Sequence, residues 1–419
     1  MRVLMLAQWY DPIIGGEEIH VRTLAATLAG RGHDVAVATL AHQDRPSVEL
    51  DGHVRVHRIR ATVQRLGRLF ADQRRQSAPP FPDPEAVLAL REIIRRERPE
   101  IVHAHNWLVH SYLPLHAGSG AGLVLTLHDY SLVCAKKNLT FRGVPCSGPA
   151  LEKCLRCAAA HYGPAKGSVT VAGIRAMGVV ERRAVDRFIA VSRAVADGNR
   201  LEASGLPYEV IPNFIPDEHP PAGPGDAALL GLLPAEPYLL FVGGLARLKG
   251  VDVLLRAYRR LAAPPPLVLI GYRTSERLAS LEDLPAGVTV VTDWPQTAVM
   301  EAWRRSLLGI VPSTWPEPFG LVTLEAMAAG RALVASRIGG LVDIVADGTT
   351  GVLVEPGDDA RLAAAIAALI RDDARRDRMG RAAQDRVRDF RAGAVVPRLE
   401  AVYRDVLAAA GDGHGARTN

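Results

Sequence analysis

The chain has 419 residues, a length that predicts two or three domains at roughly 100–200 residues per domain. Hydrophobic residues make up 48% and charged residues 23%, which excludes a disordered chain and allows a sizeable core in each domain. The formal net charge is +5 at pH 7, but only 5% of the residues are aromatic. Nucleic-acid binders usually gather basic charge in one stripe or carry aromatic stacking platforms, so we expect no nucleic-acid partner.

The start of the chain predicts a buried strand rather than a targeting segment. The apolar run at residues 3–7 is short and lacks a small-residue cleavage site, and no apolar run approaches the ~20 residues of a membrane span. We therefore expect a cytoplasmic protein. Residues 58–75 interleave arginines with apolar side chains, which predicts either peripheral contact with the cytoplasmic face of an anionic membrane or a solvated helix or loop.

Along the first half of the chain, short apolar runs alternate with helical patterns. Runs of this kind, each followed by a helix such as 18–30, indicate a parallel sheet that is covered on both faces. The predicted strands are residues 3–7, 35–39, 54–59, 101–104, 123–127, 187–192 and 209–211.

The same pattern starts again after a Pro-, Gly- and Ala-rich stretch at residues 216–237. The second set of predicted strands is 238–242, 267–270, 288–292, 308–312, 332–335 and 352–354, before a helical region at 360–410 and a frayed tail at 411–419. We therefore expect an α/β fold of two doubly wound, Rossmann-like domains facing across a cleft, with ligands at the carboxyl ends of the strands. The predicted domains are 1–212 and 213–385, with a C-terminal helix in 386–419 that packs back on the first domain.

A glycine turn follows the first strand of each domain. Gly15 and Gly16 precede the first helix, where the backbone can approach a ligand closely and free amides favour an anion. Gly244 follows the first strand of the second domain, and the cations Arg247 and Lys249 behind it suit a diphosphate. A plain strand-to-helix turn with two solvated cations is the alternative. Neither turn has the G-x-G-x-x-G pattern, which disfavours a dehydrogenase.

The most distinctive segment of the second domain carries two carboxylates. Glu317 lies in a proline-bracketed loop, and Phe319 and Gly320 then open a helix whose first amides can meet phosphate or hydroxyl groups. Glu325 lies inside that helix, up to ~12 Å from Glu317 along the axis. This separation is too large for an acid–base dyad on one bond, but it suits the two ends of an elongated ligand. A helix acid favoured only by the helix dipole is the alternative for Glu325.

Polar side chains also follow two neighbouring strands of the first domain. His105 and Asn106 follow the strand 101–104, and His128 and Asp129 end the strand 123–127. Polar residues at the carboxyl ends of parallel strands are candidate site residues. Packed histidines and a capping aspartate are the alternatives.

All four cysteines lie between residues 134 and 157, in one insert. Cys154 and Cys157 have the C-x2-C spacing of a zinc knuckle, and Cys134 and Cys146 would complete a structural zinc site. Four ordinary thiols in a lysine-bearing loop are the alternative. No D-x-D element ends a predicted strand, so we expect no metal cofactor in catalysis.

Together these motifs resemble those of glycosyltransferase family 4, the group 1 retaining enzymes with the GT-B fold. The resemblance runs from residue 2 to about residue 358. Its most specific piece is the E-x7-E element from Glu317 to Glu325 within PEPFGLVTLEAMAAG. Four further segments support it in order along the chain: GGEEIHVRTLAATLAGRGHDV, VSRAVAD, VIPNF and VGGLARLKGVDVLLRA.

The resemblance implies a nucleotide-sugar donor on the second domain and an acceptor on the first. In such enzymes His128 and Glu317 would be the catalytic residues, facing and positioning the donor sugar. Lys249 would hold the diphosphate, and Glu325 would bond the ribose. The implied donor-binding set is Gly15, Gly16, Gly244, Arg247, Lys249, Phe319, Gly320, Leu321 and Glu325, and the acceptor side is His105, Asn106 and Asp129. Gly244 stands where the family usually has an arginine, for which Arg247 is the candidate replacement.

These inferences predict a retaining glycosyltransferase, with a UDP-sugar expected before a GDP-sugar as donor. The acceptor would be a glycan, a glycolipid or a small molecule. Two alternatives remain open: another GT-B enzyme such as a nucleotide-sugar epimerase, and a non-catalytic nucleotide-sugar sensor.

Overall fold

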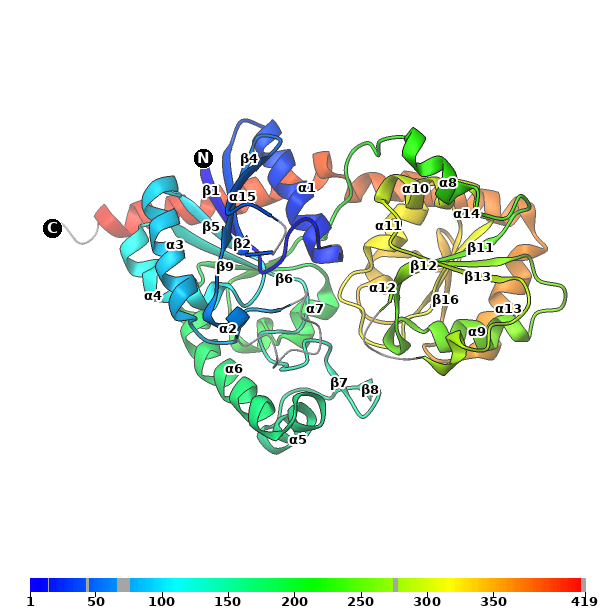
Figure 1. The fold of residues 1–419 in the computed structure, drawn as a ribbon, viewed down its shortest axis with the longest axis horizontal. Helices are drawn as coiled ribbons and strands as arrows, with labels where there is room; N and C mark the ends of the chain where they lie inside the picture. Colours follow the sequence, from blue (N-terminus) through cyan, green and yellow to red (C-terminus); the bar gives the residue numbers. More distant parts are fainter. Residues whose placement is uncertain (14, 43–44, 66–75, 274–277, 416–419) are drawn as a thin grey trace. The chain divides into compact units, whose positions relative to one another are not determined.

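The computed structural model describes residues 1–13, 15–42, 45–65, 76–273 and 278–415, and they form two compact units (Figure 1). Unit 1 comprises Met1–Asn213 and Ala392–Asn419, and unit 2 comprises Phe214–Arg391. The divisions predicted from the sequence lie after residues 212 and 385. The second division falls later because the turn Val387–Phe390 stays with unit 2, where the carbonyl of Phe390 accepts the amide of Ile215 at 3.0 Å.

Unit 1 is built on an eight-stranded sheet of order β10-β9-β6-β5-β1-β2-β4-β3. All neighbours are parallel except β3 and β4, which corrects the prediction of a purely parallel sheet. The sequence pattern hides β3 because it is a short edge strand whose residues are all at least partly exposed. The strands are β1 (Arg2–Leu6), β2 (Asp34–Leu40), β3 (Val48–Asp51), β4 (Val54–Ile59), β5 (Ile101–Ala104), β6 (Gly122–Leu127), β9 (Arg187–Ala190) and β10 (Tyr208–Val210).

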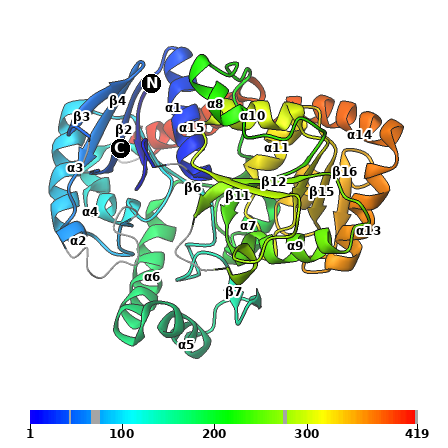
Figure 2. The same ribbon diagram turned by 45° about the vertical axis from the view of Figure 1, so that its right-hand side comes forward.

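Two groups of helices cover this sheet (Figure 1, Figure 2). Helix α15 from the end of the chain packs against α1 and β6, and α3, α4 and α6 form a second packed row. Right-handed crossovers place these two groups on opposite faces of the sheet. The helices are α1 (Gly16–Gly30), α2 (Thr62–Arg65), α3 (Pro84–Glu97), α4 (Val109–Ser119), α5 (Leu151–Tyr162), α6 (Pro164–Ala184), α7 (Arg193–Gly198) and α15 (Ala392–Gly415), with a 3₁₀ turn at Glu202–Ser204.

The starts of the unit 1 helices follow their local sequence. Asp83 caps α3 because its side chain accepts the amide of Ala86 at 3.2 Å, and Pro84 takes the first helical position. Ser192 caps α7 in the same way. The start of α1 has no side-chain cap, since Gly15 stands there, and its first-turn amides point away from the helix body.

The cysteine-bearing insert contains a small hairpin and leads into a helical pair. Strands β7 (Thr140–Phe141) and β8 (Val144–Pro145) form the hairpin, and α5 then packs against α6 (Figure 2). Cys154 and Cys157 are therefore helical residues of α5, whereas Cys134 and Cys146 lie in the loops before it.

Unit 2 is built on a six-stranded sheet that is parallel throughout, of order β13-β12-β11-β14-β15-β16. Its strands are β11 (Leu239–Leu245), β12 (Leu267–Arg273), β13 (Val288–Thr292), β14 (Leu308–Val311), β15 (Leu333–Ser336) and β16 (Gly351–Val354). Its helices are α8 (Ala227–Leu230), α9 (Val251–Arg259), α10 (Gln296–Arg305), α11 (Leu321–Ala328), α12 (Leu341–Ile344), α13 (Asp359–Ile370) and α14 (Asp373–Arg386). Short 3₁₀ turns are η3 (Pro224–Asp226), η4 (Arg247–Lys249), η5 (Ala279–Leu281) and η6 (Val387–Phe390).

In each unit the strand order reverses at one point, which fixes where a ligand site forms. In unit 1 the chain runs outward from β1 to β4 on one side and from β5 to β10 on the other. In unit 2 the reversal lies between β11 and β14. Ligands of such sheets bind at the carboxyl ends of the strands beside this reversal. The polar residues predicted from the sequence follow β1, β5 and β6 in unit 1, and β11 and β14 in unit 2.

Candidate active site

In unit 2 the turn after β11 lies directly against the loop after β14. Gly250 has a φ of +77°, and a Cβ added to it would lie 1.8 Å from the carbonyl oxygen of Pro312, so only glycine fits there. The amide of Thr314 also donates to the carbonyl of Leu248 at 2.9 Å. These two backbone contacts bring Lys249 beside the loop after β14.

Lys249 forms an ion pair with Glu317, at the centre of this loop. The Lys249 Nζ lies 2.7 Å from Oε1 and 2.8 Å from Oε2 of Glu317. Oε2 also accepts the Ser313 hydroxyl at 3.0 Å and the indole N–H of Trp315 at 3.0 Å. The Glu317 side chain is 8% exposed and that of Lys249 is 31% exposed, so the lysine forms the solvent side of the pair. Lys249 is the single lysine between residues 214 and 391.

The backbone around Glu317 is held as firmly as its side chain. Gly339 has a φ of +59°, and a Cβ on it would lie 2.2 Å from the carbonyl oxygen of Glu317. That carbonyl accepts the amide of Gly340 at 2.7 Å. The turn before α12 therefore packs against the backbone of Glu317, while Lys249, Ser313 and Trp315 hold its side chain.

The start of α11 follows at once and carries the predicted phosphate-facing backbone. Phe319 is 3% exposed, and its ring centroid lies 6.2 Å from that of Phe390. Gly320 precedes the helix and Leu321 is its first residue. The amide of Thr323 donates to the carbonyl of Gly320 at 2.9 Å, whereas the first helical amide, that of Leu321, has no carbonyl a turn earlier in the helix and is available to an anion or a hydroxyl group.

The second carboxylate, Glu325, lies on α11 and is buried. Its Oε1 accepts the side-chain amide of Gln296 at 2.9 Å, and its Oε2 accepts the indole N–H of Trp303 at 3.3 Å. Burial raises the pKa of Glu325, while these two hydrogen bonds act in the opposite direction. Helix α10 thus holds the carboxylate from one side, and its remaining lone pairs are the ones that a hydroxyl group would use.

Gly244 and Arg247 precede Lys249 at the end of β11, and the carbonyl of Arg247 accepts the Thr314 hydroxyl at 3.2 Å. A Cβ at Gly244 would lie 3.0 Å from the hydroxyl oxygen of Tyr272, which crowds the place where the family has an arginine. The Arg247 side chain is 69% exposed, and its guanidinium lies 4.0 Å from Asp252 on α9.

In unit 1, Asn106 connects the end of β5 to the start of α1. Its Oδ1 accepts the amides of Gln8 at 3.1 Å and Leu108 at 3.2 Å, and its Nδ2 donates to the carboxylate of Glu17. Both faces of the Asn106 amide are therefore used to fix the turns at the reversal point of the sheet.

Glu17 is a titratable residue of this site that the sequence reasoning did not single out. Burial raises its pKa to about 8, the negative charges of Glu18 and Asp129 add to the rise, and Lys137 opposes it. The raised pKa favours the neutral form of Glu17 beside the amides of Gly15 and Gly16, which suits a site for an anion. The signal in the sequence was two adjacent acids directly after a glycine pair.

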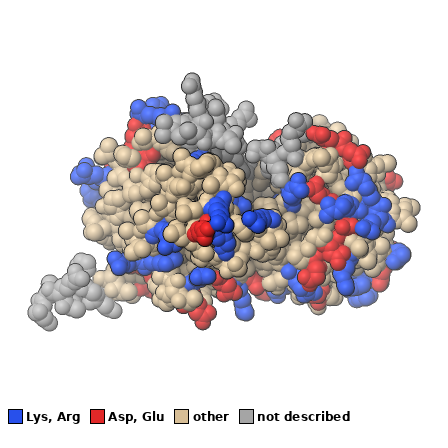
Figure 3. Space-filling model, turned by 90° about the horizontal axis from the view of Figure 1, so that it is seen from below, with Lys and Arg blue, Asp and Glu red and all other residues tan. Residues whose placement is uncertain are grey.

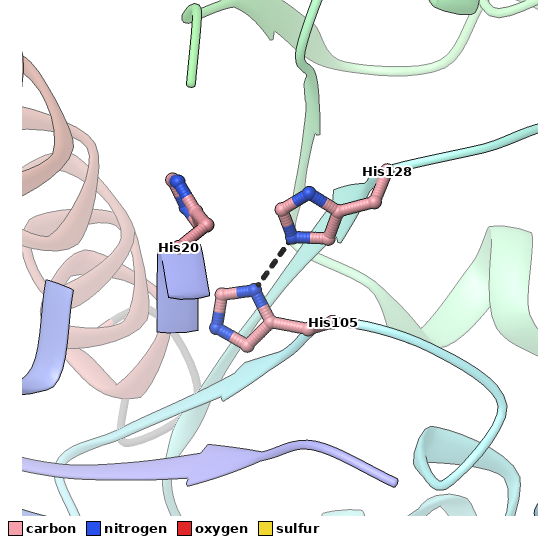
Figure 4. A group of neighbouring side chains, drawn as sticks. All are labelled: His20, His105 and His128. Atoms are coloured by element: carbon pink, nitrogen blue, oxygen red, sulfur yellow. Dashed lines mark hydrogen bonds between the residues drawn. The ribbon is translucent and has the colours of Figure 1, made fainter. Parts of the chain in front are cut away.

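The remaining predicted residues of unit 1 lie around a cluster of histidines (Figure 4). The Nδ1 of His105 lies 3.0 Å from the Nε2 of His128, and the ring centroids of His20 and His128 are 4.9 Å apart. The ring centroids of His103 and His105 are 4.1 Å apart, and the Nδ1 of His103 bonds the Tyr403 hydroxyl at 2.7 Å. Burial lowers the pKa of His20 and of His103 to about 3, and lowers those of His105 and His128 well below the ordinary value. All four imidazoles are therefore neutral.

Asp129 is held beside these histidines, and the insert reaches the same region. The Oδ1 of Asp129 accepts the amide of Ser131 at 2.8 Å, which is the local capping bond that the sequence allowed. From the insert, the Nζ of Lys137 lies 3.9 Å from the ring centroid of Trp107. The insert thus contributes a cation to the edge of the unit 1 site.

Comparison with known proteins identifies the family. The model described as Glycosyltransferase Family 4 matches residues 14–219, and the model described as Glycosyl transferases group 1 matches residues 230–386. The D-inositol 3-phosphate glycosyltransferase 1 of Catenulispora acidiphila is 33% identical over 325 residues, which span 74% of this chain and 72% of that protein. The chain belongs to glycosyltransferase family 4.

Solved structures agree with the fold of a GT-B glycosyltransferase. The sucrose-phosphate synthase from Thermosynechococcus elongatus superposes with a TM-score of 0.76 at 23% identity, covering 97% of this chain and 99% of that one. HepE of Anabaena, in complex with UDP and glucose, superposes with a TM-score of 0.68 at 19% identity, covering 97% of this chain and 100% of that one. The predicted fold class of two Rossmann-like units is confirmed.

The structure does not assemble the four cysteines of this glycosyltransferase into a metal site. All four are free and half-buried, and Cys146 and Cys157 direct their thiols at the carbonyls of Gly148 (3.5 Å) and Thr140 (3.7 Å). Among the described residues, no three of the sulfurs lie within 4.8 Å of one another. Burial raises the pKa of the Cys134 thiol, and the neighbouring Cys157 adds to this. The structural zinc site therefore stays a prediction.

The basic stretch at residues 58–75 is not one amphipathic helix, which corrects that interpretation. Arg58 lies on β4 and is 5% exposed, with its guanidinium bonded to the carboxylate of Glu49. Within residues 58–65 only Thr62–Arg65 is helical, and residues 66–75 lie outside the described part of the chain. Within the described residues, no helix combines the length and hydropathy of a membrane span. On the face shown in Figure 3, basic and acidic side chains are interspersed.

Proposed function

We propose that this glycosyltransferase transfers a sugar from a nucleotide-sugar donor to an acceptor with retention of the anomeric configuration. The observation that carries the proposal is the Lys249–Glu317 pair at the reversal point of the unit 2 sheet, beside the start of α11. A cation and the amides at the start of α11 suit a diphosphate, and the carboxylate fixed beside them suits hydroxyl groups. Together they match a ligand that has a diphosphate at one end and hydroxyl groups at the other. The solved complex of HepE with UDP and glucose supports a UDP-sugar as the donor.

We assign the donor to unit 2 by chemistry. Lys249 and the amides at Phe319, Gly320 and Leu321 bind the diphosphate and the sugar hydroxyl groups. Glu317 orients the sugar, and Glu325 accepts a hydrogen bond from the ribose. Gly244 lies in the strand that leads to the Lys249 turn, and Arg247, whose side chain is 69% exposed, adds a cation at the start of that turn.

Unit 1 supplies the acceptor side in this proposal. The neutral imidazole of His128 accepts a hydrogen bond from a sugar hydroxyl group, and the amides at Gly15 and Gly16 add to the binding of the diphosphate. His105, Asn106 and Asp129 line the acceptor end. The names of similar proteins refer to compounds as different as D-inositol 3-phosphate and sucrose phosphate, so the acceptor class is proposed only as a hydroxyl-bearing glycan, glycolipid or small molecule.

The occupied lone pairs of Glu317 favour front-face transfer over a covalent intermediate. Its carboxylate already accepts two contacts from Lys249, one from Ser313 and one from Trp315, which leaves few lone pairs for attack on a sugar. In front-face transfer the acceptor oxygen forms the new glycosidic bond on the side from which the diphosphate departs, and the leaving phosphate takes the acceptor proton. The protein then contributes positioning and stabilisation of charge on the diphosphate.

The test begins with thermal-shift measurements using UDP, GDP and ADP and their glucose conjugates. A native-state ligand raises the melting temperature by mass action, so the nucleotide that gives a shift identifies the base. Lys249→Met should reduce the shift at a given nucleotide concentration, whereas Arg256→Met, which removes an exposed cation from α9, should preserve it. No shift with any nucleotide would refute the donor site.

Turnover then separates the alternatives. Slow release of free sugar from the donor in the absence of acceptor, with the same anomeric configuration, supports a retaining transferase. Release of an epimerised nucleotide sugar would instead identify an epimerase, and tight binding with neither transfer nor hydrolysis would identify a sensor.

A further inference from the structure

Three histidines from three separate elements meet inside unit 1. His20 lies on α1, His105 follows β5 and His128 follows β6 (Figure 4). One ring nitrogen of each histidine lies within 4.8 Å of a ring nitrogen of the other two, which is the grouping that metal ligation requires. His20 and His105 are 3% and 2% exposed, and His128 is half-buried.

The spacing of the rings is close to what one metal ion requires. A tetrahedral ion bound at about 2.0–2.1 Å holds its ligand nitrogens roughly 3.4 Å apart. The Nδ1 of His105 and the Nε2 of His128 are 3.0 Å apart. The nitrogen of His20 lies within 4.8 Å of the other two, so it needs to approach by no more than about 1.4 Å.

The protonation of the rings also suits a metal ion. Metal ligation requires an unprotonated nitrogen on each imidazole, and the 3.0 Å contact between His105 Nδ1 and His128 Nε2 itself needs one such nitrogen as its acceptor. In the metal-free pair, one ring donates its proton to the other across the 3.0 Å contact. That proton has another place on the same ring, because His105 Nε2 and His128 Nδ1 are buried and have no hydrogen-bond partner in the described protein. Binding therefore needs a change of tautomer and no loss of a proton.

We propose that His20, His105 and His128 form a binding site for one divalent transition-metal ion of the zinc class. Three nitrogen ligands select Zn²⁺, Ni²⁺ or Co²⁺ over Mg²⁺ and Ca²⁺, which prefer oxygen. Three protein ligands also leave a fourth position open to water or to a hydroxyl group of a ligand. An ion on the Nε2 of His128 leaves the ring proton on Nδ1, so His128 can no longer accept the sugar hydroxyl group and the ion inhibits transfer. This consequence rests on the proposed function, whereas binding of the ion does not.

The site is tested on the untagged full chain by equilibrium dialysis against Zn²⁺ and by titration with Co²⁺. We expect one equivalent that gives the visible absorption of tetrahedral cobalt without the near-ultraviolet charge-transfer band of thiolate ligation. His20→Asn should lose this equivalent, and His53→Ala, which removes an exposed histidine, should retain it. Replacing Cys154 and Cys157 together by serine should also retain it, which distinguishes this ion from one in the cysteine insert.

The melting temperature provides the second readout. Zn²⁺ should raise the melting temperature of the wild type and of His53→Ala but not that of His20→Asn, whose metal-free value reports whether it is folded. A folded His20→Asn protein that binds the same ion would overturn the proposal, as would an equivalent lost only with the cysteines. If the ion binds at the histidines and no donor is turned over under any condition, the site stands and the proposed function fails.

Discussion

The Lys249–Glu317 ion pair makes the sharpest quantitative prediction of the structure. At an effective dielectric constant of about 20, unit charges 2.7 Å apart attract by about 6 kcal/mol before any cost is counted. Lys249 is 31% exposed, so water screens the pair, and the nearly buried Glu317 has lost most of its hydration. We therefore expect a net coupling of about 1–2 kcal/mol between the two side chains.

A double-mutant cycle measures this coupling. The variants are Lys249→Met, Glu317→Gln and the combination of both, unfolded in urea and followed by the fluorescence of the tryptophans. Trp315 donates directly to Glu317, so it reports the transition of unit 2. Lys249→Met should be the worst single variant, since it leaves a nearly buried carboxylate without its cation at a cost of about 2–3 kcal/mol. The second substitution should then recover about 1–2 kcal/mol.

Glu301→Gln is the matched control for the loss of a glutamate charge, because Glu301 pairs with Arg304 and Arg305 on the open surface of α10. It should change the unfolding free energy by less than about 0.5 kcal/mol. A coupling below about 0.3 kcal/mol would refute the reasoning, because independent sites add within that margin. Lys249→Met should also weaken nucleotide binding by about 10- to 150-fold, the value of a charged hydrogen bond of about 1.5–3 kcal/mol.

Three further outcomes are expected. Gly250→Ala should destabilise unit 2 by more than about 3 kcal/mol in urea unfolding, because the added Cβ would meet the carbonyl of Pro312. Gly348→Ala is the control, since Gly348 has a φ of +76° with open space around it, and it should cost only about 1–2 kcal/mol. Equal costs for the two variants would contradict the close approach of Gly250 to Pro312. Glu325→Ala should raise the donor KM with little change in kcat, and an unchanged donor affinity would remove its ribose role. The Arg31 and His33 contacts lower the pKa of Glu400 from 4.5 to about 2, which stabilises the folded state above pH 4.5 and is lost as the pH falls toward 2. Glu400→Gln should therefore cost about 1–2 kcal/mol at pH 7 and almost nothing at pH 2, and a pH-independent loss would argue against the ion pair.

Much of the fold was predictable because buried parallel strands have a simple sequence signature. Continuous apolar runs such as residues 3–7 and 308–312 correspond to β1 and β14, with ends that differ by a residue. The edge strand β3 and the hairpin β7–β8 were not predicted, because exposed short strands carry no such run. The helical pair α5–α6 was not predicted either, because the cysteines of the insert, two of which lie on α5, were interpreted as a metal site.

The candidate site was predictable as a set of residues but not as a set of contacts. Parallel strands end at one edge of the sheet, so residues that follow β5, β6, β11 and β14 had to lie at the two reversal points. The sequence could not show that Lys249 bonds to Glu317, 68 residues later, because that contact depends on the close approach of Gly250 to Pro312. It also gave no reason to choose Glu17, whose pKa of about 8 is set by burial and by Glu18 and Asp129.

Sequence alone therefore determined the two-unit architecture, the family and the order of the motifs, since periodicity and local spacing are properties of neighbouring residues. Tertiary structure alone decided which side chains share a site. His20, His105 and His128 come from three elements and meet only because α1 follows the end of β1, beside the ends of β5 and β6 in the sheet. Arg31 and Glu400 are 369 residues apart and meet because the last helix returns to unit 1. Charge, burial and protonation at such places follow from the packing of distant elements, which no local pattern encodes.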